Sequence, residues 1–347
     1  MLLKIALAII VLWDGYFFLN YLISLLNKYI TKEWNPFVSI LIPAYNEERN
    51  IEKAVSSALA QNYENFEVLV IDDGSEDETF EKAIQIKDPR LRVFKMPHGG
   101  KAKALNFGLS KANGEVIVTT DADTQLNNNA TKELIKRFHD DVVCVGGQVR
   151  VLGHSFLERA QDVEHLRIAM FRRAKELEDL SVAPGPISAF RRDALEKIGG
   201  FVESKVEDYA TTIELKKVGR VVYAPNAKAF TKMPSSIKTL WRQRKRWFLG
   251  DLEHFGGGFE KEWFFLLFGD FITLLDIILP IALALSSQWL LLGFFLAFEV
   301  LTILVPTLAE GGSLMNAFLF PFFLWFWALF YLTLHIYGYL HVLFSRV

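Results

Sequence analysis

The chain has 347 residues, of which 51% are hydrophobic, and 30 of them are phenylalanine. The apolar excess lies at the two ends, so the composition is typical of a membrane protein with a water-soluble middle. A formal net charge of -2 excludes a general nucleic-acid binder, because no basic surplus is available to neutralise phosphates. The single cysteine, Cys144, excludes an intrachain disulfide and a cysteine-rich metal site.

The chain opens with an apolar run over residues 2–26, which is long enough to span a bilayer as a helix. Lys4 is the only basic residue at the start of this run, and no small-residue cleavage site follows the run. We therefore interpret it as a retained anchor rather than a cleaved signal peptide. Lys28 and Lys32 come next, and by the positive-inside rule they predict that the following segment is cytosolic.

From residue 37 to about residue 232, short apolar runs alternate with stretches of helical spacing. Strands are expected at 37–42, 66–71, 91–94, 116–118 and 142–151, and helices at 47–61, 77–87, 101–112 and 129–139. This alternation predicts an α/β fold with a doubly wound, mostly parallel sheet. Ligands of such sheets bind beyond the carboxyl ends of the strands, where Asp72, Asp73, Asp121 and Asp123 are expected.

The second half of the chain is predicted to be mainly helical. Residues 154–180 form an expected long helix with one apolar stripe and a charge-rich face that is most simply solvated. Residues 236–250 combine Trp and Phe at helical spacing with Lys and Arg, which is typical of an amphipathic helix in the membrane interface. After a glycine-rich break at 256–258, three apolar segments at about 263–285, 289–308 and 314–344 predict three further spans.

These segments together predict four parts of the chain. We expect an N-terminal transmembrane anchor at 1–28, a cytosolic domain at 29–232, interfacial amphipathic helices at 233–262 and three transmembrane helices at 263–347. With an external N terminus, the four spans leave the middle domain inside the cell and the C terminus outside. The expected location is the plasma membrane, as a multi-pass protein with the domain 29–232 in the cytosol.

Asp121 and Asp123 stand two residues apart at an expected strand end, so their carboxylates point the same way. That arrangement suits a hard divalent cation, which often binds through one or two carboxylates plus substrate phosphates. A second acidic pair, Glu207 and Asp208, is able to supply a base. The basic and aromatic segment 243–247 is able to hold a phosphate-bearing donor, so the pattern indicates a sugar-transfer site.

These motifs occur in an order that resembles glycosyltransferase family 2. More narrowly, they resemble its membrane-embedded processive branch, the cellulose, chitin, hyaluronan and poly-N-acetylglucosamine synthases. The ordered set is Pro43-Ala-Tyr-Asn-Glu47, Asp72-Asp-Gly-Ser75, Gly99-Gly-Lys-Ala102, Asp121-Ala-Asp123, Glu207-Asp208 and Gln243-x-x-Arg246-Trp247. The resemblance covers about residues 37–250, and it implies a GT-A-type fold and an inverting, metal-dependent transfer from a nucleotide sugar.

The resemblance also implies roles for individual residues. Donor-binding positions are Pro43, Tyr45, Glu47, Asp72, Asp73, Lys101, Asp121, Asp123, Gln243, Arg246 and Trp247. Among these, Lys101 is implied to contact the diphosphate, and Asp123, with Asp121, to hold Mg2+ or Mn2+. Asp208 is implied to be the general base and Glu207 to shape its setting, although Val206 stands where many relatives have threonine. Phe190 and Trp247 are implied to lie at the acceptor end.

The expected partners are a UDP-linked sugar donor, a glycan or lipid acceptor and membrane lipids, and a homo-oligomer is compatible with the sequence. A narrower alternative is the transfer of one sugar to a polyprenyl phosphate or another lipid. The Gln-x-x-Arg-Trp segment argues against this alternative, whereas the small number of later spans favours it. A non-catalytic membrane protein is disfavoured by the intact acidic set. The sugar, the linkage and the acceptor stay open.

Four ionisable residues lie well inside the apolar segments: Asp14, Asp276, Glu299 and His335. Such groups are costly in a membrane and usually face a polar interior. Two explanations stay open for them. They border a polar route for a growing sugar chain or an acceptor headgroup, or they bond to one another or to a second protomer and only fix helix packing.

Overall fold

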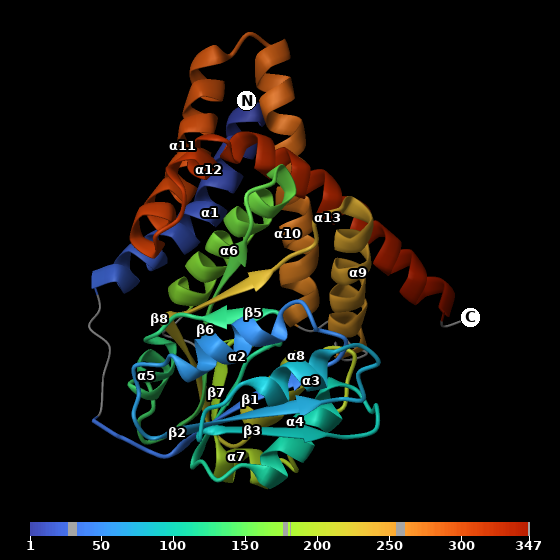
Figure 1. Cartoon of the computed structure of the whole chain (residues 1–347). Helices are drawn as coiled ribbons and strands as arrows, with labels where there is room; N and C mark the ends of the chain where they lie inside the picture. The colour runs from blue at the N-terminus through green and yellow to red at the C-terminus, as the bar shows by residue number, and fades with distance from the viewer. Residues whose placement is uncertain (27–32, 176–179, 181, 255–260, 346–347) are drawn as a thin grey trace. The chain divides into compact units, whose positions relative to one another are not determined.

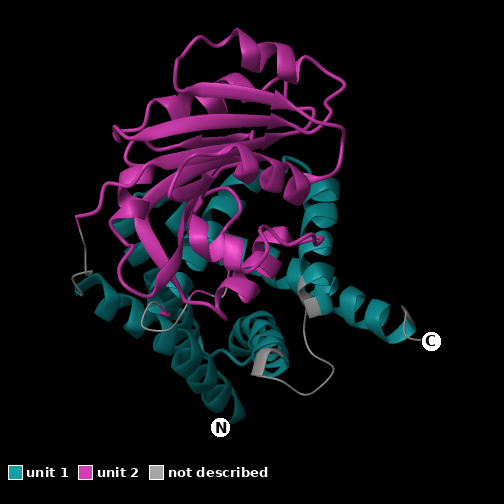
Figure 2. Ribbon diagram, turned by 90° about the horizontal axis from the view of Figure 1, so that it is seen from below, with its two compact units in different colours: residues 1–26, 153–174, 233–347 teal, residues 27–152, 175–232 magenta. Residues whose placement is uncertain are grey.

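The computed structural model describes residues 1–26, 33–175, 180, 182–254 and 261–345. It divides into two compact units (Figure 2). Unit 1 contains residues 1–26, 153–174 and 233–347, and unit 2 contains residues 27–152 and 175–232. The predictions made for Lys28, Lys32 and the glycine-rich break at 256–258 lie outside the described residues.

Unit 2 is built on an eight-stranded sheet with the strand order β3-β2-β1-β4-β7-β6-β8-β5 (Figure 1). The strands are β1 Val38–Ala44, β2 Phe66–Asp72, β3 Leu91–Lys95, β4 Val116–Thr119, β5 Thr124–Leu126, β6 Val142–Leu152, β7 Ser188–Arg191 and β8 Arg220–Lys232. Strands β3, β2, β1 and β4 are mutually parallel, as is the pair β6 and β8. Strand β7 runs antiparallel to β4 and β6, and β5 runs antiparallel to β8.

The α/β fold class is therefore confirmed, with a sheet that is more mixed than expected. The parallel half follows from its sequence, because β1 and β2 are near-continuous apolar runs that are buried on both faces. Strands β5, β7 and β8 were not predicted. Strands β5 and β7 have only 3 and 4 residues, which is too short for a recognisable hydrophobic period.

Helices join the strands of unit 2. They are α2 Ile51–Leu59, α3 Thr79–Gln85, α4 Lys101–Lys111, α5 Ala130–Ile135, α7 Arg192–Lys197 and α8 Glu207–Leu215. Helix α4 packs against β1 and β2. A Cβ atom at Gly108 would lie 2.8 Å from Cδ1 of Ile71, so this glycine allows the close approach of α4 to the sheet. The N terminus of α4 is thereby positioned near the carboxyl ends of the central strands.

The described part of unit 1 is helical (Figure 1). Its helices are α1 Leu2–Leu26, α6 Phe156–Ala174, α9 Ile237–His254, α10 Lys261–Leu285, α11 Trp289–Glu310, α12 Leu314–Phe318 and α13 Phe320–Ser345. Four helical stretches are long and apolar enough to cross a membrane: Leu2–Leu26, Trp263–Leu285, Trp289–Glu310 and Phe320–Phe344. The segment expected at 314–344 is thus divided between α12 and α13.

Helix α6 departs from the expectation of a solvated charged face. Its polar residues Gln161, Asp162, Glu164 and His165 are buried. The reason is that α6 packs against α1, α11, α12 and α13, so both of its faces lie inside unit 1. Periodicity detects the apolar stripe of a helix, but it does not distinguish a polar face in water from one in the polar interior of a bundle.

Candidate functional site

The loop after β1 carries Tyr45 and Glu47, two of the predicted donor contacts. Tyr45 is 42% exposed and stacks on His98, with the ring centroids 4.2 Å apart. The half-buried carboxylate of Glu47 accepts a hydrogen bond from the side chain of Asn50 at 2.6 Å. Burial raises the pKa of Glu47 in spite of that bond. Pro43 lies within β1, and its neighbours in the sheet come from β2.

Asp72 and Asp73 stand at the end of β2, and both are buried. The carboxylate of Asp73 accepts the backbone N–H groups of Gly99 and Gly100, each at 2.8 Å. The loop at 98–100 also lies close to Gly74, which has a φ of +74°, because a Cβ atom there would lie 2.7 Å from the nitrogen of residue 98. Asp73 therefore holds the loop that leads into α4. The turn-like sequence Asp72-Asp-Gly-Ser75 does not by itself reveal this role.

Lys101 is the first residue of α4, and its ammonium joins the two acidic motifs. Its Nζ atom lies 2.7 Å from Oδ1 of Asp121 and 2.7 Å from Oε1 of Glu207. Burial acts to lower the pKa of Lys101, but the charges of Asp121, Glu207 and Asp208 outweigh it and raise that pKa. The lysine is therefore a firmly charged group at a helix N terminus, where anions are favoured.

Asp121 and Asp123 lie in the turn between β4 and β5, as the sequence indicates. Two hydroxyls, those of Thr124 and Thr231, donate to Oδ1 of Asp123 at 3.3 and 3.2 Å. Burial, followed by the charges of Asp121 and Glu47, raises the pKa of Asp123 to about 6. The raised pKa of Asp123 thus reflects first the burial of its carboxylate and then the negative charge around it.

This donor set fits a divalent metal ion. The carboxylate oxygens of Asp121 and Asp123 are hard ligands of the kind that Mg2+ and Mn2+ bind. The two threonine hydroxyls both bond to Oδ1 of Asp123, which leaves its Oδ2 for a ligand. A cation here would also relieve the repulsion that raises the pKa of Asp123.

Glu207 and Asp208 begin α8, and backbone groups hold the carboxylate of Asp208. Oδ2 accepts the N–H of Gly185 at 3.2 Å, and Oδ1 accepts the N–H of Tyr209 at 2.9 Å. Burial and the charge of Glu207 raise the pKa of Asp208, and the charge of Lys101 opposes them. The carboxylate is thus fixed in position and made more basic than an ordinary aspartate.

The remaining predicted donor contacts lie on α9 in unit 1. Arg246 is exposed, whereas Gln243 and Trp247 are half-buried. Between them, Arg244 is buried and forms an ion pair with Glu164 of α6, with Nη2 2.6 Å from the carboxylate. Arg244 also donates to the side chain of Gln243 at 2.8 Å and lies 4.2 Å above the ring of Trp247. It therefore orients two motif residues.

Phe190, predicted at the acceptor end, lies in the core of unit 2. It is 5% exposed, belongs to β7 and packs edge-on against Phe201, with the centroids 5.4 Å apart. A side chain enclosed in this way supports the sheet and does not present a surface to an acceptor. Gly185, in the same segment, is the residue that faces the site, because a Cβ atom there would lie 2.8 Å from Nζ of Lys101.

Sequence reasoning did not identify Thr231, Arg244 or Glu164, and it gave Gly185 no contact within the site. Thr231 acts from β8, far from Asp123 along the chain. Arg244 and Glu164 look like ordinary solvated charges in their helical patterns. No local signal marks any of these residues, because each owes its role to a contact between distant segments.

Comparison with known proteins agrees with these features. Residues 39–199 match the model of glycosyl transferase family 2. The poly-beta-1,6-N-acetyl-D-glucosamine synthases of Staphylococcus aureus (strain COL) and Staphylococcus epidermidis are 31% identical over 225 residues and 30% identical over 229 residues. Each alignment covers 62% of this chain and 55% of the relative, so the chain spans about half the length of these curated relatives.

A solved structure shares the fold. It is the mannosyltransferase PcManGT from Pyrobaculum calidifontis in complex with GDP-Man and Mn2+. The TM-score is 0.63 at 22% sequence identity, and the superposition covers 100% of both chains. The family match, the identity to the synthases and the site motifs agree that residues 39–199 are similar to glycosyl transferase family 2.

Proposed function

We propose that the chain is a membrane-embedded, inverting β-glycosyltransferase that depends on a divalent metal ion. It transfers a hexose or N-acetylhexosamine from a UDP-linked sugar to a growing polysaccharide or glycolipid. The observation that carries this proposal is the position of Lys101, 2.7 Å from both Asp121 and Glu207. It brings the expected metal-binding pair and the expected base to one place in unit 2. The likeness to poly-N-acetylglucosamine synthases favours an N-acetylhexosamine donor.

The four apolar helices support a multi-pass protein, with the anchor at 1–28 and three spans within 263–347. We place unit 2 on the cytosolic side of the plasma membrane, where nucleotide sugars are made available to such an enzyme. Helix α9, within the interfacial segment 233–262, has basic and aromatic residues that suit the membrane surface.

The nucleotide and its diphosphate would be held by residues that are already positioned. The exposed ring of Tyr45 is able to stack on a base, and the carboxylate of Glu47 is able to accept from its imide edge. The ammonium of Lys101 would exchange a carboxylate contact for a diphosphate oxygen. A Mg2+ or Mn2+ ion held by Asp123 and Asp121 would neutralise the charge that develops on the leaving diphosphate.

Asp208 removes the proton from the acceptor hydroxyl in this proposal. Its two bonds from backbone N–H groups fix the direction of the carboxylate. As the proton moves to Asp208, the acceptor oxygen attacks the anomeric carbon from the face opposite the diphosphate. The bond to the diphosphate breaks, and an α-linked donor gives a β-linked product. Positioning and charge neutralisation supply most of the rate.

We also propose roles in donor and acceptor binding for Gln243, Arg246 and Trp247 of α9, as the motif that they form implies. The exposed guanidinium of Arg246 suits the diphosphate, because its planar fork matches phosphate oxygens. The indole of Trp247 offers a flat surface on which an acceptor sugar ring is able to stack. The ion pair of Arg244 with Glu164 supports this assignment, because it holds the helix that carries these side chains.

The test uses the purified full chain in lipid nanodiscs. UDP-N-acetylglucosamine, UDP-glucose and GDP-mannose are each supplied with Mg2+ or Mn2+, and released nucleotide and product mass are measured. We expect metal-dependent nucleotide release with one of the UDP sugars, and none with Asp208→Asn. Release at the wild-type rate from Asp208→Asn would remove Asp208 as the base. The absence of transfer with every donor would overturn the proposed function.

The second candidate is the transfer of one sugar to a polyprenyl phosphate or another lipid. Three candidate spans follow unit 2 in the described part of the chain, which is few for a self-contained polysaccharide channel. Product mass separates the two candidates. A ladder of masses one sugar apart supports the processive enzyme, and a single addition to a lipid supports the one-step enzyme.

A further inference from the structure

Three buried carboxylates from different helices meet inside unit 1. They belong to Asp14 of α1, Asp276 of α10 and Glu299 of α11, and their ligand oxygens all lie within 4.8 Å of one another. Their side chains are almost completely enclosed, since the residues are 4%, 6% and 1% exposed. Each residue also lies near the middle of a candidate span. An ionised group is most costly at that depth of a membrane, so the cluster requires a physical explanation.

Four of the carboxylate oxygens at this cluster lack hydrogen-bond partners among the described residues. Oδ2 of Asp14, Oδ1 of Asp276 and both oxygens of Glu299 are buried and accept no hydrogen bond there. Glu299 is the strongest case, because its whole carboxylate is enclosed and faces the other two. Buried polar atoms in folded proteins are nearly always paired. The unpaired oxygens therefore point to a ligand that supplies positive charge.

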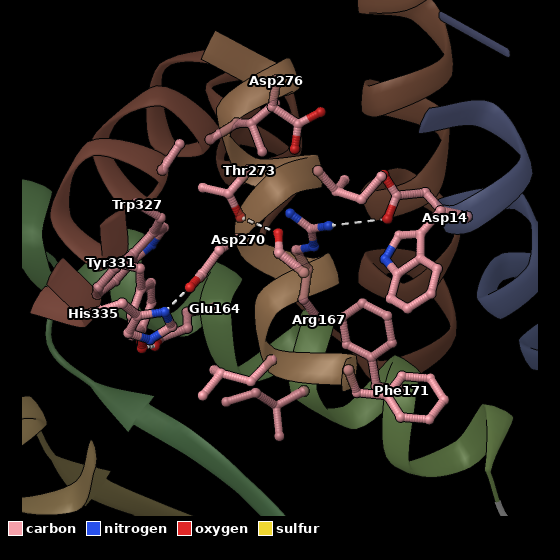
Figure 3. A pocket seen from close by; sticks show the side chains of 18 of the residues that line it. Asp14, Glu164, Arg167, Phe171, Asp270, Thr273, Asp276, Trp327, Tyr331 and His335 are labelled. Atoms are coloured by element: carbon pink, nitrogen blue, oxygen red, sulfur yellow. Dashed lines mark hydrogen bonds and ion pairs between the residues drawn. The ribbon is translucent and has the colours of Figure 1, made fainter. Parts of the chain in front are cut away.

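The charges lead to the same conclusion. Arg167 of α6 directs its guanidinium towards Asp14, with Nη2 3.7 Å from Oδ1 (Figure 3). This contact offsets one of the three carboxylates. Two negative charges remain if Asp276 and Glu299 are ionised, and a single divalent cation would balance them.

From this arrangement we propose that Asp14, Asp276 and Glu299 form a binding site for a divalent cation of the size of Ca2+, within the membrane part of the protein. Oxygens on opposite sides of Ca2+ are separated by up to about 4.6 to 5.2 Å, because its bonds are about 2.3 to 2.6 Å long. The corresponding separation around Mg2+ is about 4.0 to 4.2 Å. The ligand oxygens of the cluster lie within 4.8 Å of one another, a separation that the larger ion is able to span.

A cavity borders two of the three carboxylates. It has a volume of about 410 Å³, and Asp14, Arg167 and Asp276 are among its lining residues, together with Trp13 (Figure 3). Glu299 is not among the residues that line this cavity. A bound ion would join α1, α10 and α11, which are distant in sequence, and would stabilise their packing by mass action.

The first experiment measures Ca2+ binding to the purified full chain in detergent, after removal of metals by a chelator. The Asp123→Asn variant is used, so that the metal site proposed in unit 2 is removed. We expect one Ca2+ per chain by equilibrium dialysis and a melting temperature that rises with Ca2+ concentration. Adding Glu299→Gln should weaken binding at least 10-fold and abolish the rise. Adding Asp270→Asn should leave both unchanged, because Asp270 lines the same cavity but bonds to His335.

A second measurement leaves the carboxylates of Asp14, Asp276 and Glu299 unchanged. Tb3+, which occupies Ca2+ sites, is added to the Asp123→Asn protein, and its luminescence is excited through tryptophan. We expect a signal that Ca2+ displaces and that Trp13→Phe reduces. The proposal is overturned if the Asp123→Asn protein binds no Ca2+ and has the same melting temperature in Ca2+ as in a chelator. It is also overturned if Glu299→Gln binds Ca2+ as tightly as before. Neither result bears on the proposed sugar transfer, which is measured separately by nucleotide release.

Discussion

The ammonium of Lys101 lies 2.7 Å from the carboxylate of Glu207, and this contact connects two parts of the site that are far apart in sequence. The same ammonium lies 2.7 Å from Asp121, so the two acidic motifs share one positive charge. Without Lys101, the carboxylates of Asp121, Glu207 and Asp208 would repel one another. The lysine therefore holds the two acidic motifs together, and in the proposed function it contacts the diphosphate of the donor.

Replacing Lys101 by methionine should reduce nucleotide release about 100- to 1,000-fold, the usual effect of losing one preorganised charge on a transition state. The charge of Lys101 lowers the pKa of Asp208, so its loss should also shift the acid limb of the pH–rate profile to higher pH. Both effects are measured by initial rates over a pH series. The matched control is Lys103→Met on the same helix, because Lys103 forms a longer, exposed pair with Glu203. An acid limb that stays in place would contradict the assignment of that limb to Asp208.

Asp208→Asn should abolish transfer, with a loss of about 100- to 10,000-fold for a general base, while UDP-sugar binding persists. The raised pKa of Asp208 places the acid limb of the wild-type profile above the ordinary range of aspartate. Because the pKa of Asp208 is higher in the folded than in the unfolded protein, ionisation of Asp208 opposes folding. The stability that the protonated form contributes is complete below the unfolded pKa and is lost as the pH rises through the folded pKa. The asparagine variant should therefore melt at a higher temperature than the wild type at neutral pH. Thermal unfolding at pH 7 measures this difference, and a lower melting temperature would count against it.

Thr231→Val should weaken metal binding about 10-fold or more, because residues that orient a ligand commonly contribute to that extent. The hydroxyl of Thr231 donates to Asp123 at 3.2 Å, and valine has the same shape without the donor. The measurement is the Mn2+ concentration that gives half-maximal nucleotide release. Thr131→Val is the control, because its buried hydroxyl has no partner among the described residues. Metal affinity should also fall below about pH 6, where Asp123 takes up a proton.

Gly185→Ala should impair transfer while the protein stays folded. The new Cβ atom would lie 2.8 Å from Nζ of Lys101, the mobile end of a long side chain that is able to move away. The ammonium would then leave its place between Asp121 and Glu207, at little cost in stability. Gly293→Ala is the control, because nothing lies within 4 Å of the added atom there. Equal activity of the two variants at saturating donor would argue against a tight requirement for the position of Lys101.

Replacing Arg244 should mainly lower stability, whereas replacing Arg246 should mainly lower activity. Arg244→Ala removes the ion-pair partner of the buried carboxylate of Glu164, which then keeps only the hydrogen bond from Tyr331 among the described residues, and should destabilise the protein by about 3 to 5 kcal/mol. Arg246 is exposed, so Arg246→Ala should retain the melting temperature and lose nucleotide release. Both variants are compared by thermal unfolding and by initial rates in the same lipid. A stable but inactive Arg244→Ala would show that Arg244 contributes to transfer, for example by positioning Gln243 and Trp247, rather than to stability.

Several features of the protein could be predicted from the sequence because they depend on local patterns. Long apolar runs predicted the spans, since a bilayer requires about 20 apolar residues in a row whatever lies around them. The parallel core strands were also predicted, because buried strands are continuous apolar runs. The Asp121-Ala-Asp123 and Glu207-Asp208 pairs were recognisable by their order along the chain.

Contacts between distant segments required the tertiary structure. The short strands β5 and β7 pair with remote partners, so their own residues carry too little information to identify them. The buried position of Phe190 follows from the antiparallel strand to which it belongs, and the buried polar face of α6 follows from the helices around it. The sequence alone determined which chemical groups the chain possesses and that part of it belongs in a membrane. Only the tertiary structure decided that Lys101 stands between two acidic motifs and that three membrane carboxylates meet, because proximity across long loops depends on the packing of the whole unit.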